Sequence, residues 1–432
     1  MTQLVWFRNN LRVEDNKPLA EAMKAEGDVI AVYCFDPRHY AETEFEFPKT
    51  GAFRAQFLIE SIANLQEKLS TLTIPLFLFH DKPEVVFPNL IANFEVKNIF
   101  SQTEWTSEEV SVTNAVKSKS TEQVAWHQYY DQFLFHPEDI PYNDFSKIPK
   151  VFTEFRKKCE KYTSVRELAE SPKKQNCSIS AEKIAKFTTK IPSLQALGLE
   201  PPKLDHRTAF PFQGGETAGR ERIQNYIWET QNIATYKQTR NELIGTEYSS
   251  KFSAWLANGS ISPRMIYWEV KKFEKQVKKN QDTHWIVFEL IWRDFFKFIS
   301  LKYGDKLFTM GGVLEKKYNW KISEAIKEQW IEGKTKYNFV NANMKELAKT
   351  GWMSNRGRQN VASFWAKELQ QDWRIGASYF ESLFIDYDVH SNWGNWQYVS
   401  GVGNDPRDRK FNIEKQAENY DPNGAYVNVW LK

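Results

Sequence analysis

Short apolar runs alternate with longer amphipathic stretches over the first 130 residues, a pattern typical of a parallel sheet covered by helices on both faces. The apolar runs predict strands at 4–7, 29–35, 74–80, 98–101 and 123–127. The stretches between them predict helices at 16–25, 51–69, 84–94 and 107–118. We therefore expect residues 1–130 to form a doubly wound, five-stranded parallel α/β domain.

The pattern changes twice beyond residue 130. Residues 131–215 contain eight prolines and a lysine-rich middle, which predicts a connector that wraps the surface without long helices. Strand patterns are absent from residues 216–432, where the periodicity predicts helices at 217–230, 251–256, 263–276, 283–303, 323–332, 341–350, 356–371 and 377–385. The expected architecture is an α/β domain, a connector and an all-helical domain.

Aromatic residues and charge are both unevenly distributed. Aromatic residues make up 15% of the 432 residues, and 13 of the 16 Trp lie after residue 215. Residues 1–215 carry 26 basic and 29 acidic side chains, whereas residues 216–432 carry 32 basic and 26 acidic ones. The helical half is therefore basic enough to meet phosphates.

The three cysteines show no CxxC spacing. They support neither a disulfide framework nor a zinc site, and they favour a reducing compartment. No signal-peptide pattern opens the chain, and no apolar stretch reaches the roughly 18–20 residues that span a bilayer. These features predict a cytoplasmic protein without a membrane segment.

Two segments of the chain bear on phosphate binding. The first predicted strand runs into Arg8-Asn9-Asn10-Leu11-Arg12 without a glycine-rich turn, which disfavours a dinucleotide site in the first domain. The predicted helix at 251–256 is preceded by hydroxyls and a lysine at 248–253, and a helix start of this kind suits a pyrophosphate. Ordinary N-capping explains the same residues, so both alternatives stay open.

Polar residues among aromatic ones mark two further segments. One helical face carries a glutamate, an indole, an arginine and a phenyl ring, at positions 289, 292, 293 and 296. A surface salt bridge over a buried aromatic stripe would explain this face. A functional site would explain it equally well, because a glutamate is costly to bury there. Residues 385–398 combine two carboxylates, amides and indoles, and we expect them to form a glycine-containing loop beside a polar ligand. His390 has no second histidine nearby, so no metal site is expected.

Taken together, these motifs resemble the photolyase/cryptochrome family. The resemblance rests on VWFRNNLRVEDN at 5–16, the serine-rich segment, ELIWRDFF at 289–296, TGWMSNRGRQNVASF at 350–364 and DYDVHSNWGNWQYVSGVGNDPR at 386–407, in this order over nearly the whole chain. The segments NRGRQ at 355–359, NWQY at 395–398 and GVGNDPR at 401–407 are similar to those of DASH-type cryptochromes.

The resemblance implies an N-terminal antenna domain and a helical domain that binds FAD. The residues that it implies for the cofactor are Tyr236, Ser249, Ser250, Lys251, Phe252, Ser253, Asn355, Arg358, Asp386, Asp388 and Asn392. Among them, Arg358 would pair with Asp386 across the isoalloxazine. Asp388 would face the polar edge of the flavin, and Asn392 would lie near its N5.

The resemblance also implies an electron path and a substrate. Trp396, Trp373 and Trp320 match the proximal, middle and distal members of a chain that carries an electron to photoexcited FAD. Glu289 would hydrogen-bond a flipped-out pyrimidine dimer and Trp292 would pack on its bases, with Asn392 as the third catalytic residue. The residues implied for DNA contact are Arg240, Glu289, Trp292, Arg293, Asn355, Arg356, Gln359 and Tyr398.

The sequence departs from the family pattern at three places. Tyr398 stands where photolyases usually have a second stacking Trp, and Gln359 stands where they usually have Met. One wall of the implied lesion pocket is therefore more polar than in photolyases that act on duplex DNA. Family members with this pattern favour lesions in single-stranded DNA, and we expect the same preference here. Residues 334–341 lack the usual Gly-x-Pro and Asp, which puts the helix start there in question.

A second chromophore is implied as well. Family members of this type commonly hold a methenyltetrahydrofolate between the domains, and the acidic segment at 104–108, with Glu104, matches the region that contacts it. A solvated helix start explains these glutamates equally well.

Three functions follow as hypotheses. The first is light-driven repair of cyclobutane pyrimidine dimers in single-stranded DNA by a monomeric deoxyribodipyrimidine photo-lyase. The second is a blue-light photoreceptor, although the chain stops at Lys432, soon after the last motif, without the long tail expected of a signalling protein. The third is a flavoprotein that binds nucleic acid without turnover.

Overall fold

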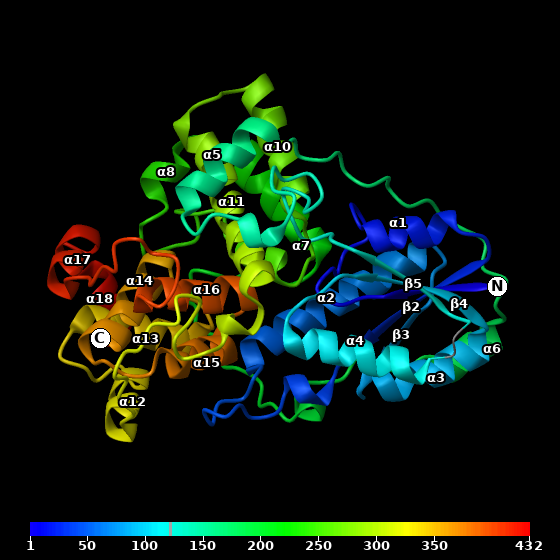
Figure 1. The fold of residues 1–432 in the computed structure, drawn as a ribbon, viewed down its shortest axis with the longest axis horizontal. Helices are drawn as coiled ribbons and strands as arrows, with labels where there is room; N and C mark the ends of the chain where they lie inside the picture. Colours follow the sequence, from blue (N-terminus) through cyan, green and yellow to red (C-terminus); the bar gives the residue numbers. More distant parts are fainter. Residues whose placement is uncertain (121–122) are drawn as a thin grey trace.

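Five parallel strands form the sheet of the N-terminal lobe in the order β3-β2-β1-β4-β5. The computed structural model describes residues 1–120 and 123–432. The strands are β1 (Thr2–Trp6), β2 (Asp28–Cys34), β3 (Leu76–Phe79), β4 (Val96–Gln102) and β5 (Ala125–Tyr129). The helices of this lobe are α1 (Lys17–Lys24), α2 (Ala52–Thr71), α3 (Pro83–Phe94) and α4 (Ser107–Lys119). The lobe lies on the right of Figure 1.

Helices cover both faces of this sheet because successive side chains of β1 point to opposite sides. Val5 packs with Leu65 of α2 in one core, whereas Leu4 and Trp6 pack with Phe87 of α3 in the other. The predicted doubly wound, five-stranded sheet is thereby confirmed.

The segment between the lobes contains two helices, α5 (Phe152–Tyr162) and α6 (Ala181–Phe187). The longer one, α5, was not predicted from the proline count. Helix α5 is eleven residues long because the stretch from 150 to 171 is free of proline. It buries Phe152, Phe155 and Cys159 in the largest core of the helical lobe. The expected connector without long helices was therefore wrong at α5.

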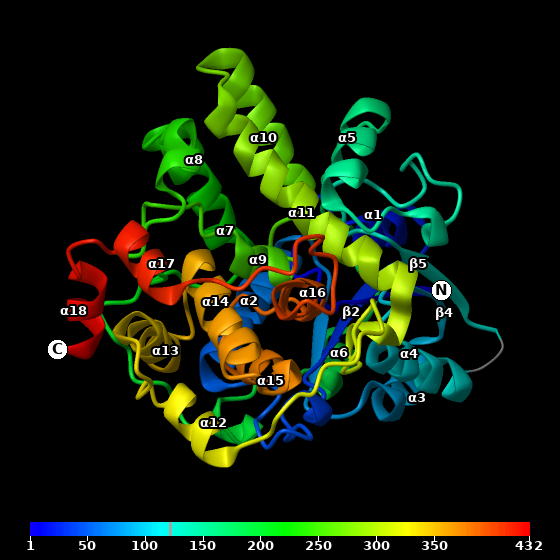
Figure 2. The same ribbon diagram turned by 60° about the vertical axis from the view of Figure 1, so that its left-hand side comes forward.

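The C-terminal lobe is helical in the part of the chain that the structure describes. Its helices are α7 (Glu216–Ile223), α8 (Tyr236–Thr239), α9 (Ser253–Ala257), α10 (Pro263–Gln276), α11 (Gln281–Tyr303), α12 (Glu324–Ile331), α13 (Asn338–Thr350), α14 (Asn355–Ser363), α15 (Trp373–Leu383), α16 (Val389–Ser400), α17 (Ile413–Tyr420) and α18 (Ala425–Leu431). Helix α16 packs against α11, α14 and α15 (Figure 2). The predicted boundaries at residues 130 and 215 stay a prediction; the sheet ends at Tyr129 and α7 begins at Glu216.

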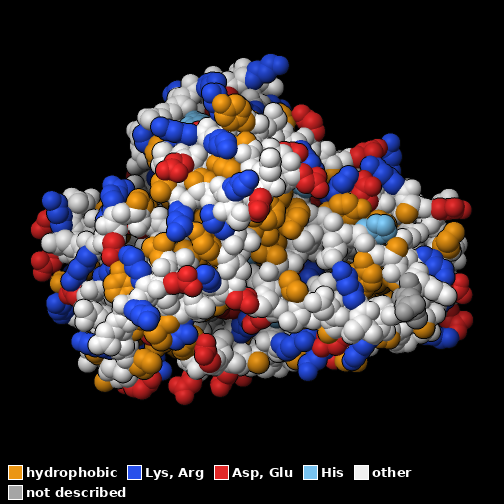
Figure 3. Space-filling model, viewed as in Figure 1, with side chains coloured by type: hydrophobic (Ala, Val, Ile, Leu, Met, Phe, Trp, Pro, Cys, Tyr) orange, Lys and Arg blue, Asp and Glu red, His pale blue; other side chains and the backbone are white. Residues whose placement is uncertain are grey.

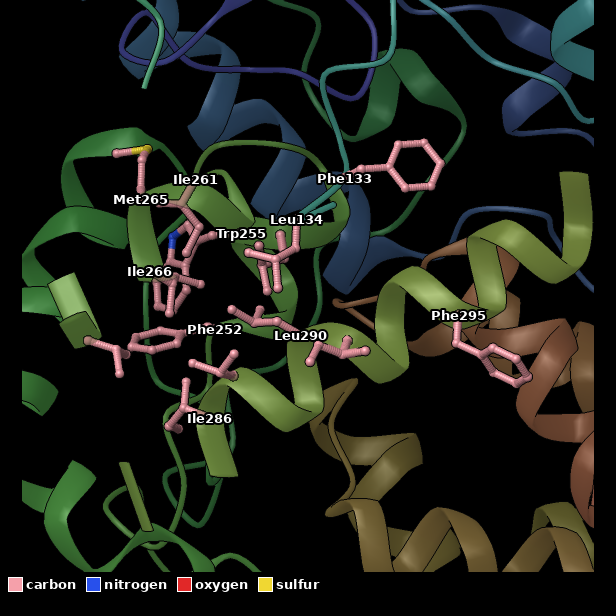
Figure 4. Close-up of a cluster of buried hydrophobic side chains, with 14 of the residues drawn as sticks. Phe133, Leu134, Phe252, Trp255, Ile261, Met265, Ile266, Ile286, Leu290 and Phe295 are labelled. Carbon is pink, nitrogen blue, oxygen red and sulfur yellow. The ribbon is translucent and has the colours of Figure 1, made fainter. Parts of the chain in front are cut away.

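Helix α11 links the core of the helical lobe to the functional site. Ile286 and Leu290 on one side of α11 point toward Phe252, Trp255 and Ile266, while Phe295 lies further along the helix (Figure 4). Burying these side chains fixes the helix, because a buried Leu, Ile or Phe stabilises the fold by roughly 1.5–3 kcal/mol. The other faces of α11 are thereby left to carry polar residues at defined positions.

The segment after β1 is locked to the helical lobe by buried ion pairs. Arg12 Nη2 lies 2.6 Å from Asp131 Oδ2, and Arg264 Nη2 lies 2.8 Å from Oδ1 of both Asp15 and Asp131. Arg12 Nη1 also donates to the carbonyl of Gly259. The segment after β1, which lacks a glycine-rich turn, thus contributes buried charged side chains whose ion pairs join the two lobes.

Candidate active site

A cavity of about 490 Å³ opens in the helical lobe between α11, α14, α16 and the segment before α9. Its volume lies within the roughly 300–1,000 Å³ typical of ligand sites. The predicted site residues that line it are Tyr236, Arg240, Ser249, Ser250, Lys251, Phe252, Ser253, Glu289, Trp292, Arg293, Asn355, Arg358, Gln359, Asp386, Asp388 and Tyr398. A smaller adjoining pocket is lined by Asn392 and Trp396.

Basic and acidic side chains are interspersed over the face shown in Figure 3.

The hydroxyls before α9 do not cap that helix. The N-cap residue of α9 is Phe252, and over the described residues no side chain donates or accepts the capping bond there. Helix α9 has five residues, so its dipole is small. Ordinary N-capping therefore does not explain Ser249, Ser250 and Ser253, and hydroxyls and amides rather than a long helix are the available anion ligands.

Lys251 is a buried cation to which no anion is hydrogen-bonded among the described residues. Its backbone has a φ of 63°, and the residue is 2% exposed. Nζ lies 3.2 Å from the centre of the Tyr248 ring and has no hydrogen-bond partner within 1–120 and 123–432. Burial lowers the pKa of Lys251 well below its usual range, and the nearby Glu346 carboxyl offsets only part of this effect. A phosphate in the cavity would supply the missing anion.

Arg222 of α7 supports this segment from behind and was missed by the sequence analysis. Its Nε donates to the carbonyl of Ser250 at 3.1 Å and its Nη2 to that of Ser249 at 3.2 Å. Its Nη1 lies 2.9 Å from Glu247. No local pattern connects residues so far apart in the chain, so only the fold reveals this role.

Arg358 and Asp386 form the pair that the sequence predicted. Nη2 of Arg358 lies 2.9 and 3.0 Å from the two carboxylate oxygens, and its Nε donates to the carbonyl of Met353. The guanidinium stacks 3.7 Å from the centre of the Phe384 ring. This anchoring fixes the orientation of both charges at the cavity wall.

Asp388 is held as an anion at the start of α16. Its Oδ1 accepts from the backbone N–H of Ser391 at 2.8 Å, and its Oδ2 accepts from Lys297 Nζ at 2.9 Å. Burial disfavours the charge, but Lys297 and Arg293 outweigh burial and hold the pKa of Asp388 far below its usual range. Lys297 was missed, although its place four residues after Arg293 on the same helical face was a usable signal.

Asn392 lies one turn beyond the start of α16. Its side-chain N–H donates to the carbonyl of Ala377 on α15 at 3.0 Å. This bond fixes the amide against the smaller pocket, which it shares with Arg358 and Asp386.

Glu289 and Arg240 form an ion pair in the lining of the cavity. Burial raises the pKa of Glu289, and Arg240 offsets only part of the rise. One turn further along α11, the Trp292 ring lines the cavity. It stacks on Phe152 of α5, with 3.6 Å between ring centres and 11° between planes. Phe152 lies outside the cavity lining as described, so the Trp292 ring presents its other side to the cavity.

Tyr398 lines the cavity beside Trp292. The two rings meet edge to face at 5.9 Å, and the Tyr398 hydroxyl accepts from Arg409 at 3.3 Å. On α14, Arg356 donates to Gln359 at 2.9 Å and to Asn241 at 3.1 Å.

Arg293, which the resemblance implies for DNA contact, lines the cavity and also bonds within the protein. Its Nη1 donates to the carbonyl of Gln132 at 2.6 Å and its Nη2 to that of Leu256 at 3.0 Å. Its guanidinium is thus used within the protein, where it ties α9 and the segment after β5 to α11.

Residues 389–400 form helix α16, and the predicted loop was wrong. Gly394 does not break the helix. A Cβ at this position would lie 2.4 Å from Phe296 Cδ1, so the glycine permits α16 to approach α11 closely. A helix also begins at Asn338, where Asn341 accepts from the backbone N–H of Thr335 at 2.8 Å in place of the motif missing at 334–341.

The three indoles of the predicted electron path gather around α15. Trp396 contacts Gly376, where a Cβ would lie 2.2 Å from its six-membered ring, and Trp373 lies one turn earlier on the same helix. Trp320 precedes a bridge between Lys321 and Gln371, which brings it beside the start of α15. Trp396 and Trp373 are buried and Trp320 is half-buried.

Glu104 lies near the junction of the lobes, after β4. Its Oε1 accepts from Gln102 at 2.8 Å, and burial raises the pKa of Glu104. The next residue, Trp105, stacks on His390 of α16 at 4.5 Å and donates to Ser300 of α11. Glu104 thus stands where the two lobes meet rather than in the first turn of α4, which begins at Ser107.

Comparison with known proteins agrees with this geometry. The family model for DNA photolyase matches residues 3–175, and that for the FAD binding domain of DNA photolyase matches residues 285–432. A cryptochrome DASH from Synechocystis is 46% identical over 100% of this chain and 87% of its own length. The chain belongs to the photolyase/cryptochrome family. A cryptochrome DASH from Xenopus laevis is 45% identical over 98% of this chain and 81% of its own length.

The photolyase/cryptochrome fold extends over both lobes. The crystal structure of the Synechocystis cryptochrome superposes with a TM-score of 0.94 at 46% identity and covers 100% of this chain and 88% of its own. A class III photolyase from Agrobacterium tumefaciens superposes with a TM-score of 0.83 at 26% identity, over 100% and 86% of the two chains.

Membership in the family identifies FAD as the cofactor and DNA as the class of substrate. The cavity fits this cofactor, because Lys251 lacks an anion and the paired Arg358 and Asp386 face the same space. Among residues 1–120 and 123–432, no helix is long and apolar enough to cross a bilayer.

Proposed function

We propose that the protein is a light-driven, FAD-dependent deoxyribodipyrimidine photo-lyase of the DASH type, which splits cyclobutane pyrimidine dimers in single-stranded DNA. The observation that carries the proposal is that Glu289 and Trp292 line the same cavity as Lys251, Arg358 and Asp386. One cavity therefore joins groups suited to damaged bases with groups suited to a flavin nucleotide.

Each part of the cavity has a proposed task. The bound FAD supplies a photoexcited electron donor. Lys251 and the amides and hydroxyls of Ser249–Ser253 hold its pyrophosphate, with Tyr236 beside them. Arg358, Asp386, Asp388 and Asn392 orient the ring, and Asn355 lies between ring and substrate.

On the substrate side, Glu289 accepts or donates a hydrogen bond to the dimer. Burial raises the pKa of Glu289 and so favours the protonated form that can donate. Trp292 and Tyr398 enclose the extruded bases between a stacking face and a polar edge. Arg240, Arg356 and Gln359 contact the strand around the opening.

The preference for single strands rests on the polar wall made by Tyr398 and Gln359. Extruding a dimer from a duplex costs a few kcal/mol, and least when the strand is already unpaired. A wall that stacks less strongly than two indoles returns less of that cost, so an unpaired strand is the favoured substrate.

An irradiated oligonucleotide tests this function. We expect dimers to disappear from the single strand under blue light with a reductant, more slowly from the duplex, and not in darkness. Glu289→Gln should slow the loss while FAD stays bound. Glu269→Gln is the matched control, because Glu269 bonds Trp228 outside the cavity. Equal loss in light and darkness, or none in either, would refute repair.

A blue-light photoreceptor is the second candidate, favoured by the burial of Trp396 and Trp373 around α15. In this case light should reduce the flavin without repair of DNA. Trp396→Phe should suppress the reduction without release of FAD, and undiminished reduction would exclude Trp396 from the path.

A methenyltetrahydrofolate between the lobes is proposed as antenna, with Glu104 as a contact. The purified protein should then show a near-ultraviolet band besides the flavin band, and Glu104→Gln should lose only the former. A spectrum of wild-type protein with the flavin band alone contradicts this assignment.

We further propose a cytoplasmic monomer. All three cysteines are free, as suits a reducing compartment. Light scattering of the purified protein should give the 50.8 kDa mass of a single chain.

A further inference from the structure

One indole beside the proposed electron path has a proton acceptor of its own. Trp393 lies on α16, and its ring contacts that of Trp373 edge to face, with 5.7 Å between centres. Its Nε1 donates to Glu381 Oε2 at 3.3 Å and to the Tyr387 hydroxyl at 3.2 Å. Tyr387 and Trp393 lie within the motif at 386–407, but no role proposed above uses this cluster.

Glu381 is placed to take up a proton. The residue is 4% exposed, and burial raises the pKa of Glu381. Arg54 and Lys49 favour its charged form, Tyr387 hydrogen-bonds it, and Glu108 disfavours the charge. The Arg54 guanidinium lies 4.5 Å from the centre of the Tyr387 ring. A carboxylate whose pKa is raised holds a transferred proton more firmly than one in water.

The three indoles of the path, and Trp330 beside Trp396, lack such a base among the described residues. Trp373 donates to the carbonyl of Met310 at 3.1 Å, and a carbonyl is a very weak base. In the described part of the chain, the N–H groups of Trp396, Trp320 and Trp330 have no hydrogen-bond partner. Because an indole that loses an electron becomes a strong N–H acid, only a site with a base nearby can stabilise the oxidised state by losing the proton.

We propose that Trp393 and Glu381 form a side branch of the electron path, in which an oxidised indole is stabilised by proton transfer. The proposal rests on the tryptophan path given above, and the oxidant that starts it is a photoexcited flavin. An electron passes from Trp393 to oxidised Trp373, and the Nε1 proton of Trp393 passes to Glu381 Oε2. The products are neutral Trp373, a neutral Trp393 radical and a protonated Glu381, so that charge and protons balance.

Stabilisation follows from the coupling of the two transfers. Return of the electron to Trp393 requires return of the proton from Glu381. Transfer back should therefore be slower than from an indole that stays a radical cation, and it should be slower still in D₂O.

Time-resolved absorption and electron paramagnetic resonance of the FAD-containing protein test the branch. After a blue flash, we expect a long-lived neutral tryptophan radical whose decay slows in D₂O. Trp393→Phe and Glu381→Gln should each shorten its life about tenfold or more, the scale of a lost proton acceptor. Glu381→Asp should restore part of it.

Trp330→Phe is the matched control, because Trp330 contacts Trp396 at 6.3 Å but has no acceptor among the described residues. Its radical life should match that of the wild type. An unchanged lifetime in Trp393→Phe overturns the branch and leaves repair untouched. If Glu381→Gln fails to fold, Trp393→Phe alone decides. Wild-type protein that shows no light-driven flavin reduction overturns both the path and the branch.

Discussion

Two regions of the molecule bury several charges, and they treat them in opposite ways. At the junction after β1, Arg12 and Arg264 each lie within 2.8 Å of a carboxylate oxygen, and the cluster is closed. In the cavity of the helical lobe, Lys251 is equally buried but has no hydrogen-bond partner in the described residues. The difference separates a structural role from a binding role, since an interior charge that the protein leaves unpaired is one that a ligand can pair.

The largest expected effect is at the closed cluster. Asp131→Asn removes a carboxylate shared by Arg12 and Arg264 and leaves buried positive charge uncompensated, so it should lower the free energy of unfolding by about 3–5 kcal/mol. Denaturant unfolding measures this. Asp205→Asn is the control, because the Asp205–Arg207 pair is partly exposed and should contribute at most about 1 kcal/mol. Similar losses of unfolding free energy in Asp131→Asn and Asp205→Asn would contradict a special structural role for the buried cluster.

The next effect is a pH dependence near the cavity. Burial raises the pKa of Glu346 to about 7, and Lys251, Arg358 and a 2.5 Å bond from Tyr426 only partly offset it. Because the pKa of folded Glu346 exceeds its unfolded value, its contribution is full below about pH 4.5 and is lost as pH rises through about 7, at a cost of about 3 kcal/mol.

Glu346→Gln should therefore flatten the curve of unfolding free energy against pH over this window. Asp294, whose pKa burial also raises to about 7, should give a similar slope that Asp294→Asn removes. A curve that keeps its slope in the double variant would show that neither group titrates in this range.

Lys251→Met should have effects of opposite sign on stability and on cofactor binding. Removing an unpaired buried charge should stabilise the FAD-free protein by about 1 kcal/mol. It should also weaken FAD binding about tenfold or more, because a charge-assisted hydrogen bond to phosphate contributes roughly 1.5–3 kcal/mol. Fluorescence titration with FAD and thermal unfolding measure the two. If Lys251→Met lost stability but kept its affinity for FAD, Lys251 would have a structural role like that of Arg12 and Arg264, rather than a role in binding.

The smallest effect concerns the wall of the cavity. Phe152→Leu removes the ring that backs Trp292 and should weaken binding of dimer-containing strands about threefold to tenfold, the value of one aromatic contact. Phe155→Leu, one turn away and packed on Phe298, should not. In a Trp292→Ala background the Phe152 substitution should add nothing. An additive loss would mean that Phe152 acts by some route other than Trp292.

Local pattern was sufficient for the sheet and for most residues of the site. Short continuous apolar runs mark the strands, and the charged and hydroxyl residues at 249–253, 358 and 386 are recognisable as ligand groups before the fold is known. Pattern failed where a residue type has two uses. Gly394 was taken as a loop residue but serves the close packing of α16 on α11, and proline density hid the proline-free stretch that becomes α5.

The sequence by itself determined the order of the lobes, the doubly wound sheet and the family, because periodicity and ordered motifs are local properties of the chain. Only the tertiary structure decided which charges are paired. Arg293, expected at the DNA strand, also bonds two carbonyls, and Lys297 pairs with Asp388, while Arg222 and Phe152 reach the site from outside the motifs. The reason is physical: the energy of a polar group depends on what surrounds it, and its surroundings are residues far away in the chain.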